Sequence, residues 1–251
     1  MPLSIDIRED SGVRTLHFGS EWIQGAMRIA RPWHLELDYT KEMMASLLLR
    51  DDKHFPRKVL LIGLGAASLT KFLYRHYPMA KLTVVEIEPN VVAAARHFFK
   101  LPNDPMRINM VVADGVDYVV NSDKTWDLIL VDGFDADARA GGLDTLPFYQ
   151  AARAHLNDNG IMAVYLLGRS HGFKDSVERI SNAFEGRALA FPSCDSGNTI
   201  AFAASGDTVS ISIGDLKEQA SALKEKTGLN LQPAIARLEQ AQTCSGNILT
   251  L

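Results

Sequence analysis

Two acidic residues and a glycine-rich turn each follow an apolar run of the sequence. Gly63-Leu64-Gly65 comes directly after the first run, and Glu86 and Asp114 come at the ends of the next two. Glycines let the chain turn sharply and let a ligand approach the main chain. A carboxylate at the end of the second run, such as Glu86, can accept hydrogen bonds from ribose hydroxyls. A carboxylate at the end of the third run, such as Asp114, can accept a hydrogen bond from an exocyclic adenine amine. Together they favour an adenosine-type ligand. The expected nucleoside contacts are Gly63, Gly65, Glu86, Ile87, Asp114 and Gly115.

Each of these positions also has a purely structural interpretation. A glycine pair is what any tight strand-to-helix turn needs, and Glu86 could be a solvated acid. Asp114 could cap a helix, because an aspartate at that point accepts hydrogen bonds from free backbone N–H groups. The turn lacks the Lys-Ser/Thr pair of a P-loop, and Ser68 stands at the third glycine position of the dinucleotide fingerprint.

An acidic loop follows the fourth apolar run. Asp132-Gly133-Phe134-Asp135-Ala136-Asp137 places three acids within six residues. Carboxylates this close repel one another unless a cation or solvent lies between them. Catalytic groups lie at such strand ends in open α/β sheets, so Asp132 and Asp135 are candidate catalytic or cation-binding residues. A solvated acidic loop is the alternative. Tyr149 is a candidate pocket residue, although its pairing with Phe148 is also typical of a core.

Alternating strands and helices between residues 58 and 205 must position these groups. Continuous apolar runs predict buried parallel strands, and the stretches between them have helical patterning. The predicted strands are 58–63, 82–87, 107–112, 126–132, 161–166, 188–191 and 198–203. The predicted helices are 68–77, 89–99, 145–155 and 173–184. This order predicts a doubly wound, mostly parallel α/β sheet of the Rossmann-like kind. A hairpin around residues 193–197 would make the last strand antiparallel.

The two ends of the chain have different patterns. Residues 1–55 predict a small β-rich cap with strands at 14–18 and 22–29, followed by a helix over 39–49. Residues 206–251 predict one or two amphipathic helices that begin at the cap Ser212 or at Gly214-Asp215. We therefore expect a cap over 1–55, a nucleoside-binding catalytic domain over 56–205, and a C-terminal helical extension over 206–251.

The composition narrows the class of protein. The chain has 251 residues, of which 47% are hydrophobic and 22% charged, and this is typical of globular proteins. No apolar run reaches the ~20 residues that cross a bilayer, and the acidic N-terminus does not resemble a signal peptide. We therefore expect a cytoplasmic protein with no membrane partner. A net charge of −4 argues against nucleic-acid binding. Two cysteines and scattered histidines indicate neither a disulfide framework nor a metal site.

Four motifs, taken together and in this order, resemble the spermidine synthase (polyamine aminopropyltransferase) family. They are Val59–Gly65, Val85–Pro89, Ala113–Gly115 and Asp127–Asp135. The resemblance spans roughly residues 15 to 205 and includes the cap segment around Gln24 and Tyr39. It implies a methyltransferase-like fold with a small N-terminal β domain, and a homodimer. It also implies a transferase that moves an aminopropyl group from decarboxylated S-adenosylmethionine to a small-molecule amine.

The resemblance implies a role for each matching residue. Glu86 would hold the ribose of the donor, and Asp114 would bind the adenine amine. Asp132 would be the base that helps to deprotonate the attacking amine, and Asp135 would hold the polyamine. The remaining expected site residues are Gln24 for the donor, Tyr39 at the catalytic centre and Tyr149 for the substrate.

Two positions depart from the family pattern. Ala66 replaces the acid that binds the amino group of the aminopropyl arm, and Ala136 replaces the proline after the second aspartate. A methyltransferase that uses intact S-adenosylmethionine needs the same Glu86 and Asp114 but no acid beside the arm. That activity is therefore one alternative, and a non-catalytic nucleoside-binding or interaction module is another.

Overall fold

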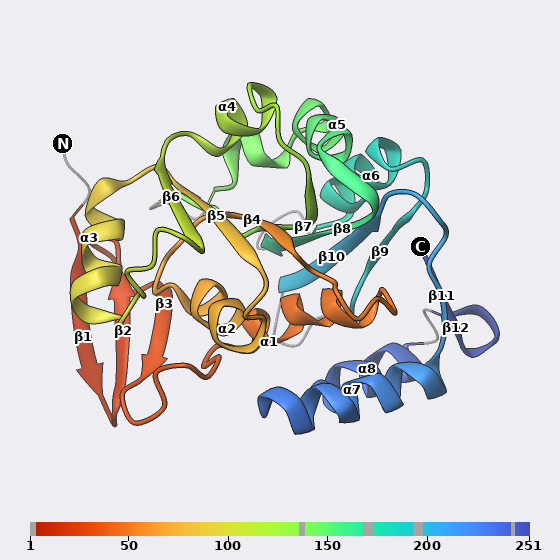
Figure 1. Cartoon of the computed structure of the whole chain (residues 1–251), viewed down its shortest axis with the longest axis horizontal. Helices are drawn as coiled ribbons and strands as arrows, with labels where there is room; N and C mark the ends of the chain where they lie inside the picture. The colour runs from red at the N-terminus through yellow and green to blue at the C-terminus, as the bar shows by residue number, and fades with distance from the viewer. Residues whose placement is uncertain (1–3, 136–138, 168–172, 193–197, 242–243) are drawn as a thin grey trace.

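The centre of the molecule is a seven-stranded sheet with strand order β6-β5-β4-β7-β8-β10-β9 (Figure 1). The computed structural model describes residues 4–135, 139–167, 173–192, 198–241 and 244–251. Strands β4 to β8 are parallel, and β10 pairs antiparallel with both β8 and β9. The strands are Lys58–Ile62 (β4), Lys81–Glu86 (β5), Ile108–Val112 (β6), Trp126–Val131 (β7), Leu156–Leu167 (β8), Ala188–Ala190 (β9) and Asn198–Ala204 (β10). The predicted fold class, including the antiparallel last strand, is confirmed. The predicted hairpin turn lies outside the described residues.

The chain order of the strands creates a crevice between β4 and β7. From β4 the chain moves outward to β5 and β6, and then returns to place β7 against the other side of β4. Ile62 and Val131 are register partners at the carboxyl ends of these strands. The connections leave such a pair in opposite directions, and ligands of open α/β sheets bind in the resulting crevice. The sequence places Gly63 and Asp132 at this point.

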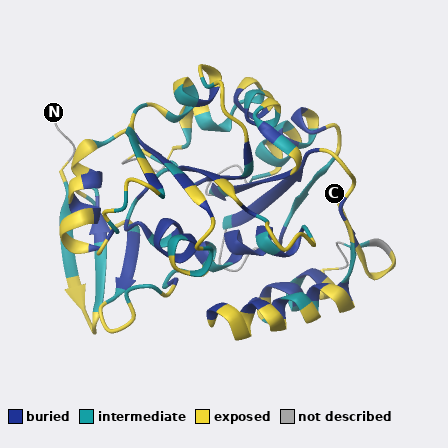
Figure 2. Cartoon of the chain, in the orientation of Figure 1, coloured by how far each residue is buried: buried dark blue, intermediate teal, exposed yellow. Residues whose placement is uncertain are grey.

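Helices cover both faces of the sheet. They are α2 (Ser68–His76), α3 (Pro89–Phe98), α4 (Gly115–Val120), α5 (Leu146–Ala154) and α6 (Lys174–Ala183). Two apolar clusters fill the two interfaces, with α4, α5 and α6 contributing to one and α2 and α3 to the other. The central strands β4, β7 and β10 between them are mostly buried, whereas the edge strands β6 and β9 are only partly buried (Figure 2). Helix α4 was not predicted, because its six residues carry too short a periodic pattern to identify.

An antiparallel three-stranded sheet forms the N-terminal cap. It consists of β1 (Asp6–Asp10), β2 (Val13–His17) and β3 (Ile23–Arg28). The predictions covered β2 and β3 but missed β1, whose sequence DIRED is mostly charged. A strand with this composition is stabilised by its pairing with β2 rather than by burial. The segment after β3 leads into α1 (Asp38–Met43) and the 3-10 helix η1 (Met44–Leu48).

Two helices at the C-terminus pack against the rest of the molecule. Helix α7 spans Ile213–Thr227 and α8 spans Gln232–Gln240, and their apolar side chains join the core cluster below the sheet. The hydroxyl of Ser212 accepts a hydrogen bond from the backbone N–H of Asp215, so the cap predicted at Ser212 is confirmed. A small sheet of β11 (Ser210–Ser212) and β12 (Ile248–Thr250), preceded by η3 (Ser245–Asn247), was not predicted. Within the described ranges, no helix has the length and apolarity to span a bilayer.

Candidate functional site

A cavity of about 1060 Å³ lies at the carboxyl edge of the sheet, where β4, β5, β6 and β7 end. Residues 18–24, from the connection between β2 and β3 into the start of β3, and residues 36–39, at the start of α1, line its other side. All but one of the residues expected from the sequence line it. They are Gln24, Tyr39, Gly63, Gly65, Glu86, Ile87, Asp114, Gly115, Asp132 and Asp135. Residues that are far apart in the sequence therefore line one cavity.

The glycine turn after β4 brings the backbone of this strand close to that of β7. Gly63 has φ +91°, and a Cβ at this position would lie 2.1 Å from the backbone oxygen of Asp132. The backbone N–H of Asp132 in turn donates to the carbonyl of Ile62 at 2.9 Å. Because neither the φ angle nor the space admits a side chain, only glycine allows this approach. The turn therefore places Asp132 beside the loop expected to hold the nucleoside.

Glu86 is buried and holds the local backbone in place. Its side chain accepts hydrogen bonds from the backbone N–H groups of Leu64 at 2.9 Å and Glu88 at 3.0 Å. Burial raises the pKa of Glu86, and these two hydrogen bonds oppose the rise. The solvated acid that the sequence left open is thus not what the structure shows. An ionised carboxylate has about four acceptor sites, so Glu86 keeps acceptor capacity toward the cavity.

Asp114 caps helix α4. Its Oδ1 atom accepts from the backbone N–H groups of Val116 at 2.8 Å and Asp117 at 3.0 Å. Asp114 is therefore the N-cap residue of α4, as the structural interpretation of the sequence proposed. Both cap bonds use Oδ1, and the residue also lines the cavity. Capping and an interaction of Oδ2 with a ligand amine are therefore compatible.

Asp132 is a half-buried carboxylate in the lining of the cavity. The hydroxyl of Tyr39 donates a hydrogen bond to its Oδ2 atom at 3.1 Å. Burial raises the pKa of Asp132 to about 7; the bond from Tyr39 lowers it, and the charge of Glu86 raises it. Burial and the Asp132 charge raise the pKa of Tyr39 as well, so its hydroxyl stays protonated and remains a donor. A carboxylate that titrates near neutral pH is suited to act as a general base.

Three aromatic rings form a wall beside Asp132. Tyr39 stacks on Tyr165 with centroids 4.1 Å apart and an interplanar angle of 12°. Phe134 meets Tyr165 edge-on, with centroids 5.5 Å apart. The sequence analysis missed Tyr165, although its place near the carboxyl end of a predicted parallel strand was a usable signal. Such a wall offers an apolar surface to a methylene chain and π faces to a cation.

The lining of the cavity is strongly acidic. Asp135 lies at the mouth and accepts a hydrogen bond from the backbone N–H of Arg139 at 2.9 Å. The cap contributes three acids that the sequence analysis missed: Glu21, Glu36 and Asp38. No motif marks them, and only the folding of the cap over the sheet edge brings them to the cavity. Ala136 and Asp137 of the acidic loop lie outside the described residues. The charge of the lining favours a cationic ligand.

Tyr149 is not in the cavity. Its side chain is fully buried in the core between the sheet and α5, and its hydroxyl donates to Asp144 at 2.9 Å. Asp144 ends the 3-10 helix η2 (Gly141–Asp144) and also accepts from Ser176 and Arg179. The expectation that Tyr149 closes the pocket is therefore wrong, and the alternative of a core aromatic is what the fold contains.

Ala66 does not form part of the cavity wall either. Its side chain is buried against the cap, where a Cβ on Gly25 would lie 2.7 Å from the Cβ of Ala66. The close packing of β3 on the glycine turn leaves no room for a side chain at position 25. Within the described residues, no group of three or more His, Cys, Asp or Glu side chains is arranged to hold a metal ion.

Comparison with known proteins identifies the family. The model of the spermine/spermidine synthase domain matches residues 37–182. A polyamine aminopropyltransferase of Chromobacterium violaceum is 34% identical over 246 residues, which cover 98% of this chain and 93% of that protein. The chain belongs to the spermine/spermidine synthase family. A second polyamine aminopropyltransferase, from Neisseria meningitidis serogroup A, is 31% identical over 96% of this chain and 91% of that protein.

Solved structures confirm the fold. A probable spermidine synthase of Corynebacterium glutamicum superposes with a TM-score of 0.74 at 18% identity, over 97% of this chain and 91% of that one. Spermidine synthase in complex with the transition-state analogue AdoDATO superposes with a TM-score of 0.66 at 23% identity, over 93% of this chain and 84% of that one. Human methyltransferase-like protein 13 in complex with SAH superposes with a TM-score of 0.69 at 24% identity, over 77% of this chain and 93% of that one. The fold is thus common to aminopropyl and methyl transferases, and the chemistry depends on the site.

Proposed function

We propose that this protein is a polyamine aminopropyltransferase that uses decarboxylated S-adenosylmethionine as the donor. The observation that carries the proposal is the half-buried Asp132 carboxylate, which accepts a hydrogen bond from Tyr39 in a cavity with an acidic and aromatic lining. Membership of the spermine/spermidine synthase family supports the same reaction. Methyl transfer to an apolar atom would have no use for this concentration of carboxylates.

The donor's nucleoside would occupy the crevice between β4 and β7. Glu86 would accept hydrogen bonds from the ribose diol, and Asp114 would accept from the adenine amine through Oδ2. Ile87 lies at the cavity with 58% of its surface exposed, and it would give the adenine an apolar contact. Gly63, Gly65, Gly115 and Gln24 would complete the binding surface. These placements put the donor's sulfonium on the side of Asp132.

The transfer would be a single displacement. The neutral nitrogen of the acceptor attacks the methylene carbon next to the sulfonium, the C–N bond forms, and the C–S bond breaks. The C–S electron pair goes to sulfur, and methylthioadenosine leaves. Before the attack, Asp132 takes one proton from the acceptor's ammonium group and passes it to solvent, which leaves that nitrogen neutral. After the attack, the positive charge of the sulfonium is on the product nitrogen. An alkyl amine has a pKa of about 10 and is mostly charged at neutral pH, so a base in contact with it assists the step.

The acceptor would lie along the aromatic wall of Tyr39, Tyr165 and Phe134. Its methylene groups would contact the rings, while Asp135 would bind an ammonium group at the mouth. The acids of the cap add to the negative field that concentrates a polycation in the cavity. A linear aliphatic diamine or triamine meets these requirements better than a single amine, because it has more than one charge.

Methyl transfer from intact S-adenosylmethionine is the second candidate, favoured by one observation. Ala66 stands where the family has an acid for the amino group of the aminopropyl arm, and its side chain does not reach the cavity. An acid there would repel the methionine carboxylate of the intact donor, and this chain lacks it. Incubation with each donor and putrescine separates the two reactions, since one yields methylthioadenosine and the other yields S-adenosylhomocysteine.

The decisive experiment changes the proposed base. Asp132→Asn keeps the shape of the side chain but cannot accept the proton, and general-base catalysis contributes about 10²–10⁴ in rate. We expect kcat with decarboxylated S-adenosylmethionine and putrescine to fall by that factor, while donor affinity is nearly unchanged. Asp135→Asn should instead raise the KM for the amine. Asp123→Asn, an exposed site outside the cavity, is the control. Wild-type kcat in Asp132→Asn would refute the proposed base.

A further inference from the structure

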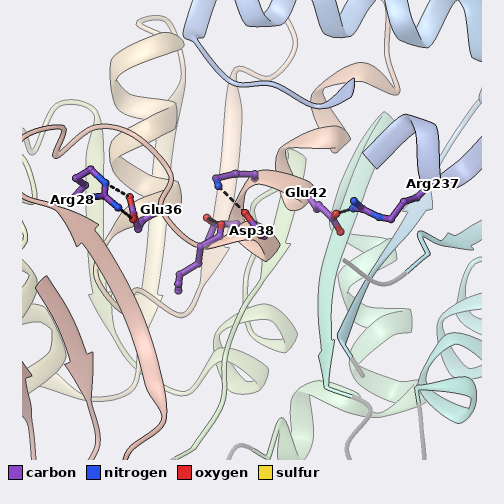
Figure 3. Close-up of polar contacts among 8 residues, drawn as sticks. Arg28, Glu36, Asp38, Glu42 and Arg237 are labelled. Carbon is purple, nitrogen blue, oxygen red and sulfur yellow. Dashed lines mark hydrogen bonds and ion pairs between the residues drawn. The ribbon is translucent and has the colours of Figure 1, made fainter. Parts of the chain in front are cut away.

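Two segments that line the cavity are held in place in different ways. In residues 36–39, the carboxylate of Glu36 pairs with Arg28 of β3, so the start of α1 is tied to the cap (Figure 3). The second segment, residues 139–143, lines the cavity between the end of β7 and the start of α5. Asp144 follows it directly, lies outside the lining, and joins it to the helices behind the sheet.

Asp144 accepts three hydrogen bonds at the end of η2. Its Oδ1 atom accepts from the hydroxyl of Tyr149 on α5 at 2.9 Å. Its Oδ2 atom accepts from the hydroxyl of Ser176 at 2.7 Å and from the guanidinium of Arg179 at 2.6 Å, and both donors lie on α6. Arg179 also donates to Ser176 at 3.1 Å, so the two donors are connected to each other. One carboxylate therefore joins η2 to two helices.

The chemistry of these donors makes the attachment strong. Arg179 and Asp144 are both charged, and charge-assisted hydrogen bonds are stronger than those between neutral groups. The bond to Asp144 raises the pKa of Arg179. Burial and the Asp144 charge raise the pKa of Tyr149, so its hydroxyl stays protonated and remains a donor. The position of Asp144 is therefore fixed relative to the core of the molecule.

Leu143 of η2 lies between two glycines of the proposed donor site. A Cβ on Gly133 would lie 2.6 Å from Cδ1 of Leu143, and a Cβ on Gly115 would lie 3.3 Å from its Cδ2. Gly115 follows Asp114, the proposed partner of the adenine amine, and Gly133 follows the proposed base Asp132. Leu143 also lines the cavity. Its side chain therefore connects the adenine end of the cavity with the loop that carries the base.

We propose that Asp144 is a positioning residue for the donor nucleoside and that it acts through Leu143. By joining η2 to α5 and α6, Asp144 keeps the Leu143 side chain against the two glycines, where it gives the adenine an apolar contact. In molecules where η2 leaves this position, the nucleoside binds poorly, so the apparent affinity falls with the fraction of molecules that have Leu143 in place. The inference rests on the donor placement of the proposed function.

The test compares methylthioadenosine affinity, measured by calorimetry, in two matched arginine variants. Arg179→Met removes the charged donor to Asp144, and the side chain is 36% exposed, so no core packing is lost. Arg153→Met removes the ion pair with Glu185, which also joins α5 to the end of α6 but lies outside the cavity. We expect affinity to fall by about threefold to tenfold in Arg179→Met and to be unchanged in Arg153→Met. Arg179→Lys, which keeps a charged donor, should recover most of the loss.

A second pair of variants tests whether the effect passes through Leu143. Leu143→Ala should weaken methylthioadenosine binding by itself, and adding Arg179→Met to it should cause little further loss, because the side chain being positioned is already absent. A merely structural role predicts additive losses, or lower stability with unchanged affinity in Arg179→Met, and either result would overturn the role of Asp144. Failure of the wild-type protein to bind methylthioadenosine would instead refute the donor placement of the proposed function, and with it this inference.

Discussion

The hydrogen bond from Tyr39 to Asp132 sets the pH at which the proposed base ionises. Asp132 has a pKa of about 7, and the Tyr39 hydroxyl lowers it from the value that burial alone would give. Tyr39→Phe keeps the ring stacked on Tyr165 and removes only this donor. A lost hydrogen bond to a charged group costs about 1.5 kcal/mol at the lower end of its range, which corresponds to roughly one pKa unit. The variant's Asp132 should therefore titrate near pH 8.

The consequence is a rate loss that depends on pH. With a pKa of about 7, roughly half of Asp132 is ionised at pH 7, whereas roughly a tenth is ionised after an upward shift of one unit. We expect kcat of Tyr39→Phe to be about fivefold below wild type at pH 7 and within about twofold of it at pH 9. The assay follows kcat against pH with saturating donor and putrescine.

A matched control separates this effect from a general loss of structure. Tyr149→Phe also removes one hydroxyl that donates to an aspartate, but its partner Asp144 lies outside the cavity. This variant should lose stability and keep the wild-type pH profile. Superimposable profiles for Tyr39→Phe and wild type would refute the argument, as would a loss in Tyr39→Phe that is the same at every pH.

Three further predictions concern ligand binding and stability. Glu86→Gln should weaken methylthioadenosine binding in calorimetry by about tenfold to 150-fold, the equivalent of 1.5–3 kcal/mol for a charged acceptor. Gly63→Ala should lower the free energy of unfolding by on the order of 3 kcal/mol or more, because its Cβ would overlap the Asp132 backbone. Gly186→Ala, also at positive φ but with open space around it, should cost only about 1–2 kcal/mol. Burial lowers the pKa of Lys71 from 10.5 to about 7. The unfolded chain therefore binds more protons between these pH values, so stability should rise with pH across this window and the rise should vanish in Lys71→Met.

Each of these predictions has an outcome that contradicts it. Unchanged nucleoside affinity in Glu86→Gln would remove this residue from the donor site. Equal losses in the two glycine variants would mean that positive φ alone, and not contact with Asp132, explains Gly63. Urea midpoints that climb equally from pH 7 to pH 9.5 in Lys71→Met and wild type would exclude Lys71 as the source of the pH dependence.

The fold of the central sheet was predictable because its signals are local. Continuous apolar runs are typical of strands buried on both faces, and Pro89 stands in the first turn of the helix that it predicted. Elements whose stability comes from distant partners were missed. Strand β1 is charged and exists through its pairing with β2, and β11 depends on β12 at the other end of the C-terminal segment.

The part of the candidate site that lies at the ends of the strands was also predictable from local signals. Gly63, Glu86, Asp114 and Asp132 each follow an apolar run, and parallel strands bring their carboxyl ends to one edge, so the sequence by itself determined that these groups would meet. Only the tertiary structure decided their environment. Burial beside Tyr39 raises the pKa of Asp132 toward neutrality, and no local pattern encodes that depth.

Tertiary packing also decided which other side chains belong to the site. Tyr149 points into the core and Ala66 packs against Gly25, whereas Tyr165, Glu36 and Asp38 reach the cavity without any motif of their own. Sequence spacing specifies the strand end at which a residue lies. The face it presents and the partner it meets depend on how the cap closes over the sheet, because those contacts join segments that are distant along the chain.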